Sequence, residues 1–399
     1  EDGADLRMTY RDVLGWHVLP VQISPIISPT AVITFALQSP ITDVSNNYWG
    51  QEEGPVVGQI AGSYELTSYY ADALFTDYRS LEVWVDDDFT PATIGFGLTN
   101  FTNLQEAIAH TMPGATINVA AGTYNEVGQI VIDKDLTIVG EDRATTIFHP
   151  TANTGSSGNS RGWFLVESEV EFNLEGVTLD GNGYLVYQGI RHLGYGVIEN
   201  VSFHDIRYQY DGSPYAGVAV VGYGTGTLDI FNSTFDEIGR VGALYFGSPL
   251  SVSTFAGNTY TGKGPGDWLD YCLDISAGAN VIVSNNIITG CEGVALSDGS
   301  ASAGILVSTF FGPGTGAEIV DNTITGNSNG IYAGFNSSDT SVVNAEYNDL
   351  SGNGTAIVAL ENTMFDATLN YFGSEQPDFG TLVTGPVSFD PWFIDLAMT

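Results

Sequence analysis

The feature that most constrains this chain is a short phrase that returns throughout its second half. "GIRHLG" begins at 189, and related short apolar runs begin at 217, 242, 272, 293, 330 and 356, so that successive starts lie 21 to 37 residues apart. A second phrase, which begins with Asn, recurs in phase at 200, 232, 258, 286, 322 and 348. Strands this short cannot bury their faces alone, so this period predicts a solenoid of stacked coils. We therefore expect an all-β fold, a parallel β-helix over about residues 115–390 with the Asn residues in a ladder.

A short helix is predicted just before the first coils. Thr102 and Gln105 have the spacing of a capping box, and Pro113-Gly114 provides a stop signal. One helical face is apolar and carries Leu104, Ile108 and Met112. We expect a capping helix near 102–112 to lie across the open end of the solenoid, because exposed strand edges need a cover.

A resemblance rests on "VDDDFTPATIGFGLTNFTNLQEAIAHTMPGATINVAAGTYNE" and the coils that follow it. This part of the chain, about residues 84–399, resembles secreted right-handed parallel β-helix proteins of the pectin-lyase-like superfold. It is most similar to modules of large prokaryotic extracellular and surface proteins. The resemblance implies a right-handed coil and an extracellular or cell-surface location. It does not select a function, because this superfold includes lyases, hydrolases, esterases, adhesins and inert filaments.

Similar phrases stand near both ends of the chain. "NNYWGQEEGP" occupies 46–55 and "LNYFGSEQPDFG" occupies 369–380. In modular proteins of the resembled class such a phrase lies in the last coils of a helix. We therefore predict two regions, a smaller β-rich N-terminal region at 1–85 and the right-handed parallel β-helix at 86–399. The alternative is a chance echo of Tyr, Trp and Gly.

The charge balance excludes several classes of partner. Lys and Arg total 10 against 47 Asp and Glu, which gives a formal net charge of −37. Nucleic acid and anionic membrane surfaces are therefore electrostatically poor partners. No apolar run reaches the roughly 18 residues that span a bilayer, and no segment has the pattern of a signal peptide. The chain begins at Glu1, so we expect a mature or excised product.

The usual catalytic arrays of this superfold are missing from the sequence. The expected outward column of the recurring strands is mostly apolar: Arg191, Ala219, Leu244, Asp274, Ala295, Tyr332 and Val358. The resemblance leads us to expect, in a lyase, a basic residue beside calcium-binding acids. In a hydrolase it leads us to expect clustered Asp pairs. Neither pattern occurs, and neither does the paired catalytic Asp of a pectin esterase.

The best enzyme candidate is a set of turns between 203 and 271. It gathers charged residues on successive coils, with aromatic residues that could stack on sugars. The catalytic candidates are Arg207, Asp236, Arg240, Lys263, Asp267 and Asp270, and the carbohydrate-binding candidates are Tyr208, Tyr210 and Trp268. The alternative, which we favour in so acidic a protein, is that each base only pairs with a neighbouring carboxylate.

No cofactor is indicated with certainty, although Asp86, Asp87 and Asp88 could hold calcium through oxygen ligands. A solvated linker is the alternative for these residues. Cys272 and Cys291 lie on adjacent coils, so either a disulfide or two buried thiols would fit.

Two classes of function remain. The first, which we favour, is an extracellular structural or adhesive protein that assembles head to tail with itself into a filament or surface layer. The second is a carbohydrate-active enzyme or carbohydrate-binding module. For the first class we expect the charge-free segment 13–42 to pair by β-augmentation with the C-terminal coils of the next subunit. The apolar residues expected at that interface are Val18, Val21, Ile23, Ile33 and Phe35.

Overall fold

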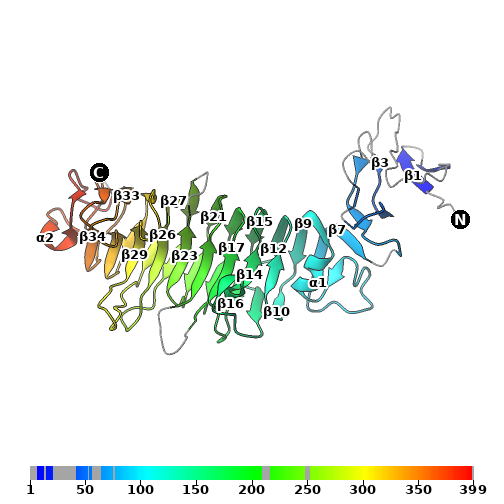
Figure 1. The fold of residues 1–399 in the computed structure, drawn as a ribbon, viewed down its shortest axis with the longest axis horizontal. Coiled ribbons are helices and arrows are strands. Elements are labelled where there is room, and N and C mark those ends of the chain that lie inside the picture. The colour runs from blue at the N-terminus through cyan, green and yellow to red at the C-terminus, as the bar shows by residue number, and fades with distance from the viewer. Residues whose placement is uncertain are drawn as a thin grey trace.

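The computed structural model describes residues 7–12, 15–20, 42–52, 54–55, 64–74, 77–208, 216–247 and 252–397. Most of these residues form a rod of stacked coils, which Figure 1 shows side by side along its long axis. Each full coil adds one strand to each of three sheets, and these strands pair in parallel with the coils before and after. The predicted parallel β-helix is confirmed.

The longest sheet has 15 strands and runs the whole length of the rod. One inward position in it is Ile, Leu, Phe, Val or Ala in eight successive coils, from Ile138 to Ala345, and every one of these residues is buried. In spatial order its strands are β4 (Asn47–Tyr48), β6 (Ser68–Tyr70), β7 (Tyr78–Val85), β9 (Thr111–Val119), β12 (Leu136–Gly140), β15 (Phe172–Glu175), β18 (Gly196–Glu199), β21 (Leu228–Phe231), β24 (Ser253–Ala256), β27 (Asn280–Ser284), β30 (Gly316–Val320), β33 (Val342–Glu346), β35 (Met364–Asp366) and β37 (Val387–Ser388), and β8 (Asn100–Phe101) pairs with β7.

Two further sheets complete the coil. The 8-stranded sheet holds β10 (Gly122–Glu126), β13 (Thr146–Pro150), β16 (Thr178–Asp180), β19 (Ser202–His204), β22 (Thr234–Asp236), β25 (Thr259–Thr261), β28 (Ile287–Thr289) and β31 (Thr323–Thr325). The 10-stranded sheet holds β11 (Ile130–Ile132), β14 (Gly162–Val166), β17 (Gln188–His192), β20 (Val218–Gly222), β23 (Val241–Phe246), β26 (Tyr271–Ser276), β29 (Ala303–Ser308), β32 (Asn329–Ala333), β34 (Thr355–Ala359) and β36 (Val383–Thr384). A short 3-10 helix, η1 (Gly158–Arg161), precedes β14.

One of the recurring runs is not a strand of a sheet. The run at 293, "GVALSD", lies in an irregular loop in which Val294 forms an isolated antiparallel bridge with Ala301. The strand of that coil is β29, which begins ten positions later. The expected outward column is therefore wrong at two places, because Val221 and Leu306 stand where Ala219 and Ala295 were predicted.

The Asn ladder is confirmed, with a shift of one residue at its start. Asn258, Asn286, Asn322, Asn348 and Asn370 lie buried on successive coils, and each backbone N–H from Asn258 to Asn348 donates to the side-chain oxygen of the next Asn at 2.8–2.9 Å. The residue before each of these positions has positive φ in every coil.

The two earlier Asn residues of the phrase occupy that preceding position. Asn200 (φ 54°) and Asn232 (φ 52°) form the left-handed turn itself, as Gly257 does in the next coil (φ 70°). Asn and Gly both tolerate this conformation. The shared letter therefore serves two different structural roles along the chain.

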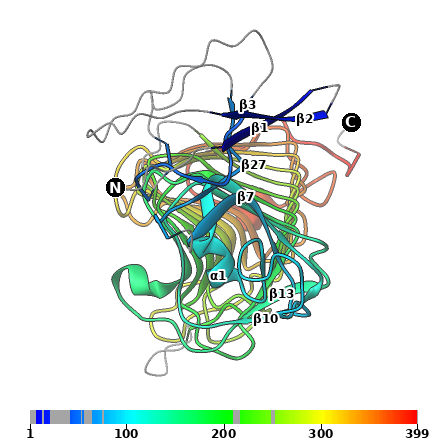
Figure 2. The same cartoon turned by 90° about the vertical axis from the view of Figure 1, so that its right-hand side faces the viewer.

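A short helix lies near each end of the rod. At the N-terminal end α1 (Leu104–Ala109) places Leu104, Ala107 and Ile108 in the core, and Figure 2 shows it across the opening. It is shorter than the predicted 102–112 at both ends. Asn103 rather than Thr102 caps it, through a 2.9 Å bond from the Glu106 N–H, and β9 already begins at Thr111, so that Met112 and Pro113-Gly114 lie in this strand and not in or just after the helix. At the C-terminal end α2 (Phe379–Leu382) adds an aromatic cluster that packs on the core: Phe372, Phe379, Phe389 and Trp392.

The N-terminal region contains short pairs of strands. β1 (Arg7–Asp12) pairs with β2 (Gly15–Pro20) in an antiparallel hairpin, and β3 (Thr42–Asp43) pairs in parallel with β5 (Tyr64–Glu65). Of the residues predicted at an inter-subunit contact, Val18 lies in β2 opposite Thr9, while Val21, Ile23, Ile33 and Phe35 lie outside the described residues. The helices described here include none long and apolar enough to cross a membrane.

The described residues of 42–74 pair as their counterparts in 365–397 do, since Thr42 lies opposite Tyr64 and Phe365 lies opposite Val387. Each residue of the first segment corresponds without a gap to the residue 323 positions later, so that "NNYWG" matches "LNYFG". Asn46 and Leu369 both have φ 60°, and Gly50 and Gly373 have φ 89° and 94°. The two copies differ at Gly54, which has φ 81° and corresponds to Pro377. The echo seen in the sequence is therefore a repeated structural unit, which we call the end coil.

The hydrogen bonds of the two end coils also correspond. The Asn47 side chain donates to the carbonyls two and three residues before it, at 3.0 and 2.9 Å. Asn370 makes the same two bonds at 3.3 and 2.8 Å. The pairing of each coil with the following segment matches too: Asn46 N with Ser68 O (2.9 Å), and Leu369 N with Pro391 O (2.7 Å).

Candidate functional site

The predicted turn set contains a network of ion pairs. Arg207 donates to Asp205 on its own coil and to Glu237 Oε2 on the next coil at 3.1 Å. Asp236 lies 3.2 Å from the Nδ1 atom of His204 on the preceding coil. These contacts join neighbouring coils. They fit the alternative that each basic residue in these turns pairs with a carboxylate on a neighbouring coil.

A second group in the same turns is buried. Lys263 Nζ lies 3.1 Å from Asp270 Oδ2 and donates to the carbonyl of Ile238 at 2.6 Å. Asp270 is fully buried and also accepts from the Tyr260 hydroxyl and, at 2.7 Å, from the Lys263 backbone N–H. Burial raises the pKa of Asp270 and raises that of Tyr260 well above its ordinary value. These groups hold the turn together and do not face solvent.

The remaining predicted residues have structural contacts as well. Asp267 accepts from the Leu296 N–H at 2.9 Å, and the indole of Trp268 donates to the Gly264 carbonyl at 3.1 Å. Tyr208 is buried with its ring 4.9 Å from that of Tyr187, and Tyr210 lies outside the described residues. Arg240 lies near Asp274. Burial raises the pKa of Asp274, and the positive charge of Arg240 offsets only part of this rise.

The solvent side of the 10-stranded sheet carries a second apolar cluster. Val221 is buried there, and Leu244, Leu306 and Tyr332 are partly buried around it. These four residues occupy the same outward position on the strands of successive coils. One coil between Leu244 and Leu306 is the exception, since it has Asp274 at that position. These side chains therefore pack against one another on the outer side of the sheet, apart from the main core of the rod.

Beside this cluster runs a continuous row of aromatic rings, which we call the ring ladder. It consists of Tyr223, Phe246, Phe311, Phe310 and Phe335, and neighbouring centroids lie 5.2, 5.1, 4.6 and 5.0 Å apart. Phe310 and Phe311 are 59% and 62% exposed. The Arg191 guanidinium extends the row, since it lies 4.4 Å from the centre of the Tyr223 ring.

The ladder crosses one coil that contributes no ring to it. The turn after β26 has Ala277 and Gly278, and the loop that carries Phe311 passes over it, with Gly312 close to Ala277. Small residues at this turn therefore let Phe311 reach Phe246. The ladder cannot be recognised in the sequence, because its rings come from turns of unequal length, which no periodic pattern marks.

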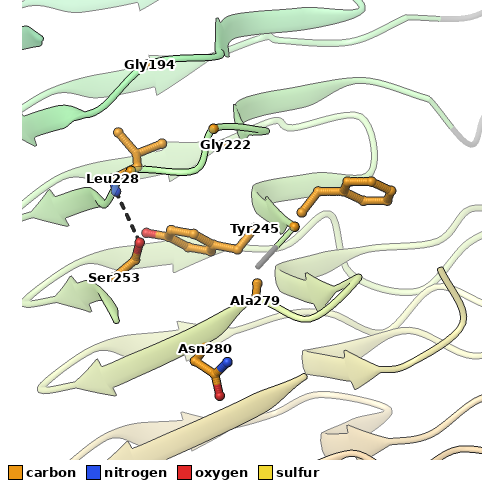
Figure 3. Close-up of a pocket in the computed structure, with 11 residues that line it drawn as sticks. Gly194, Gly222, Leu228, Tyr245, Ser253, Ala279 and Asn280 are labelled. Carbon is orange, nitrogen blue, oxygen red and sulfur yellow. Dashed lines mark hydrogen bonds between the residues drawn. The ribbon is translucent and has the colours of Figure 1, made fainter. Parts of the chain in front are cut away.

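Neither of two cavities in the described residues suits a small substrate. Figure 3 shows one beside Phe246, lined by glycines with Tyr245 and Ser253, where the Leu228 N–H donates to Ser253 Oγ at 3.1 Å. Its volume of about 20 Å³ holds roughly one water. The other, about 220 Å³, lies on the 15-stranded sheet around Asn280, Glu318 and Asn344. Typical ligand pockets are about 300–1,000 Å³.

The predicted calcium site is a turn in the structure. Carboxylate oxygens of Asp86, Asp87 and Asp88 lie within 4.8 Å of one another, and such oxygens are suitable calcium ligands. Two of the carboxylates also accept backbone N–H groups, Asp86 from Asp88 at 2.9 Å and Asp87 from Thr123 at 3.3 Å. Calcium binding here remains a prediction.

The two cysteines are free and buried, so the thiol alternative holds and the disulfide alternative does not. Burial raises the pKa of both thiols well above the ordinary value. Thiols of this kind are unreactive at neutral pH.

Comparison with known proteins gives a family and several distant structures. A search of curated proteins found no match. Among solved structures, pectin methylesterase PemA from Erwinia chrysanthemi is 12% identical with a TM-score of 0.39, over 70% of this chain and 80% of that one. The periplasmic alginate epimerase AlgG is 14% identical with a TM-score of 0.39, over 69% and 74%. The A-module of mannuronan C-5 epimerase AlgE6 from Azotobacter vinelandii is 13% identical with a TM-score of 0.30, over 70% and 86%.

The family model described as right handed beta helix region matches residues 158–372, which is more than half of the chain. This segment contains most of the three-sheet coils and the whole ring ladder. The chain belongs to the right-handed β-helix family.

Proposed function

We propose that this chain is a non-catalytic, extracellular β-helix protein that binds polysaccharide along the ring ladder. The observation that carries the proposal is the row of rings on the solvent side of the rod, with Phe310 and Phe311 more than half exposed. Exposed aromatic rings offer flat apolar faces to the C–H faces of sugars, and a row along several coils suits a polymer.

Polar groups next to the ladder supply hydrogen-bonding partners for sugar hydroxyls. Asn336, Ser337 and Ser338 follow Phe335 and are exposed. The Ser338 hydroxyl and the Ser338 N–H both bond to the side chain of Asn336, at 2.6 and 2.7 Å, which fixes that amide in place. A rigid apolar row with polar groups at one end orients a ligand as well as binding it.

The charge of the chain restricts the class of polysaccharide. A net charge of −37 repels polyuronates. The Debye length at physiological salt is about 8 Å, so this repulsion is weakened at long range but still acts on a polymer in contact with the surface. We therefore expect neutral glycans to bind and pectate and alginate to be excluded. This expectation separates the chain from enzymes that act on acidic polymers.

The test is binding to immobilised glycans with Phe311→Ala. Loss of one stacked ring is expected to weaken binding to a neutral β-glucan by about tenfold, or 1.4 kcal/mol. Ile94→Ala is the matched control, because Ile94 is 93% exposed and lies between β7 and β8, several coils before those that carry the ladder. Equal affinity in the two variants, or preferential binding to pectate, would contradict the proposal.

A second candidate function is a structural one, in which β-helix units join end to end. The specific observation in its favour is the repeated end coil, because the first copy is followed directly by a stack of coils, to which β7 joins it. The two candidates are compatible, since the ladder lies in the middle of the rod and the end coils at its termini.

A further inference from the structure

The first end coil shows how such a coil is covered. β7 pairs antiparallel with β6, with Tyr69 opposite Arg79, and then continues parallel to β9 in the main rod. β7 therefore joins the end coil to the next stack of coils as one continuous sheet.

Side chains from the following stack complete the apolar cluster of the first end coil. Tyr69 is 1% exposed and Ala71 is 5% exposed, and they pack with Trp49 and Leu66. Leu81 of β7 and Met112 of β9 close this cluster.

The second end coil has different apolar residues at the same four positions, and no counterpart of β7 or β9 lies beside it among the described residues. Trp392 and Ile394 stand at the positions of Tyr69 and Ala71, and Phe372 and Phe389 stand at those of Trp49 and Leu66. Ile394 is 51% exposed, whereas its counterpart Ala71 is buried. The more exposed copy therefore carries the larger apolar side chain, which would bury more apolar area than Ala71 does if the same cover were added.

The polar groups that receive β7 are also present in the second copy. Asp72 accepts the N–H of Asp77 at the start of this segment at 3.2 Å, and Asp395 stands at the same position. Glu52 lies 3.8 Å from the Arg79 guanidinium, and Glu375 matches it. The Leu81 N–H donates to the Thr67 carbonyl at 2.8 Å, and the backbone of Asp390 corresponds to that acceptor.

We propose that the second end coil, residues 365–397, is a docking surface for the opening segment of another β-helix unit. That segment has the chemistry of residues 77–119: an edge strand with a basic residue where Arg79 stands, an apolar residue where Leu81 stands, and an amphipathic capping helix. An intact second copy does not present it, because its own β7 is already paired with its own β6.

The docking extends the rod and does not require glycan binding. It supplies the partner for the structural role and leaves the ring ladder open, since the ladder ends at Phe335.

The experiment is a fusion in which the full chain is followed directly by a second copy of residues 77–399. Thr399 corresponds to Thr76, so the second Asp77 follows it in the native spacing. Electron microscopy is expected to show one straight rod of about twice the length of the single chain. Hydrogen exchange is expected to slow at Trp392 and Phe393, as at their counterparts Tyr69 and Tyr70.

Two variants of the fusion serve as controls. Ile394→Asp places a charge where Ala71 is buried, and Leu81→Pro in the second copy removes the donor to the end coil. Both are expected to give two rods joined at variable angles, while Ile394→Asp leaves the stability of the unextended chain unchanged. A bent, variable junction in the unmodified fusion overturns the proposal, and so does a straight rod in both variants.

Discussion

At the scale of the residue, the Asn ladder allows a test of which Asn positions are structural. Asn322 accepts the backbone N–H and the side-chain amide of Asn286, at 2.9 and 2.8 Å, and donates to the Val283 carbonyl at 2.9 Å. Asn322→Ala leaves these buried groups unpaired, so we expect the free energy of unfolding to fall by about 2–4 kcal/mol. Chemical denaturation measures this loss.

Asn232→Gly is the matched control for the ladder. Asn232 has φ 52° at the turn, and Gly257 occupies the same position one coil later. We expect a change of about 0.5 kcal/mol or less, since Gly adopts this conformation freely. Similar losses in Asn322→Ala and Asn232→Gly would mean that the two positions are equivalent after all.

His192 is a buried residue whose titration affects the stability of the fold. It is fully buried at an inward position, and burial lowers the pKa of its ring to about 4. Backbone groups of Phe172 and Gly194 favour the charged ring and so oppose part of this shift. Unfolded His has a pKa near 6.5. Between pH 6.5 and pH 4 the unfolded state binds more protons, so stability falls as the pH falls.

We therefore expect the native chain to lose about 2 kcal/mol more than His192→Leu between pH 7 and pH 5. The comparison removes the effect of the many carboxylates, because both proteins carry the same ones. Denaturation at the two pH values measures the difference, and parallel losses would show that His192 does not titrate in this range.

At the scale of the element, the turns between 203 and 271 separate buried from exposed ion pairs. Lys263→Ala leaves the fully buried Asp270 without its cation and should cost about 3–5 kcal/mol. Arg207→Ala removes a pair whose Arg side chain is 42% exposed and should cost about 1 kcal/mol or less. Denaturant unfolding of both variants checks the contrast.

The same turns carry the prediction about catalysis. We expect the chain to release no products from pectate, alginate or glycosaminoglycans, because the charged groups described in these turns are paired with one another or buried. Turnover that disappears in Arg207→Ala, while its stability stays native, would place an active site there instead.

Most of the elements could be predicted from the sequence, because their signals are local. Alternating apolar residues and small turn residues mark each strand, and the αL turns use Asn and Gly. The strand that begins at Ala303 cannot be placed from the sequence, because "GVALSD" at 293 has the same pattern but lies in a loop. The ring ladder could not be predicted, since Phe246 and Phe311 meet only once the register of three coils is known.

At the scale of the whole molecule, two contributions to stability oppose each other. The apolar core that runs the length of the rod stabilises the fold, and the net charge of −37 destabilises it. Repulsion among the carboxylates destabilises the folded state. Salt weakens this repulsion, because the Debye length falls from about 30 Å at 0.01 M to about 8 Å at 0.15 M. We expect the melting temperature to rise by about 2 °C or more over this range of NaCl, as measured by calorimetry.

The comparison of two divalent salts separates general screening from a specific site. CaCl2 and MgCl2 at equal ionic strength screen alike, so any difference between their effects on the melting temperature comes from selective binding. If Asp86, Asp87 and Asp88 form only a solvated turn, the two salts raise the melting temperature equally, and Asp87→Asn with Asp88→Asn does not change that equality. A larger rise in calcium that disappears in the double variant would assign the ion to this turn, at the point where the N-terminal end coil is joined to the main rod.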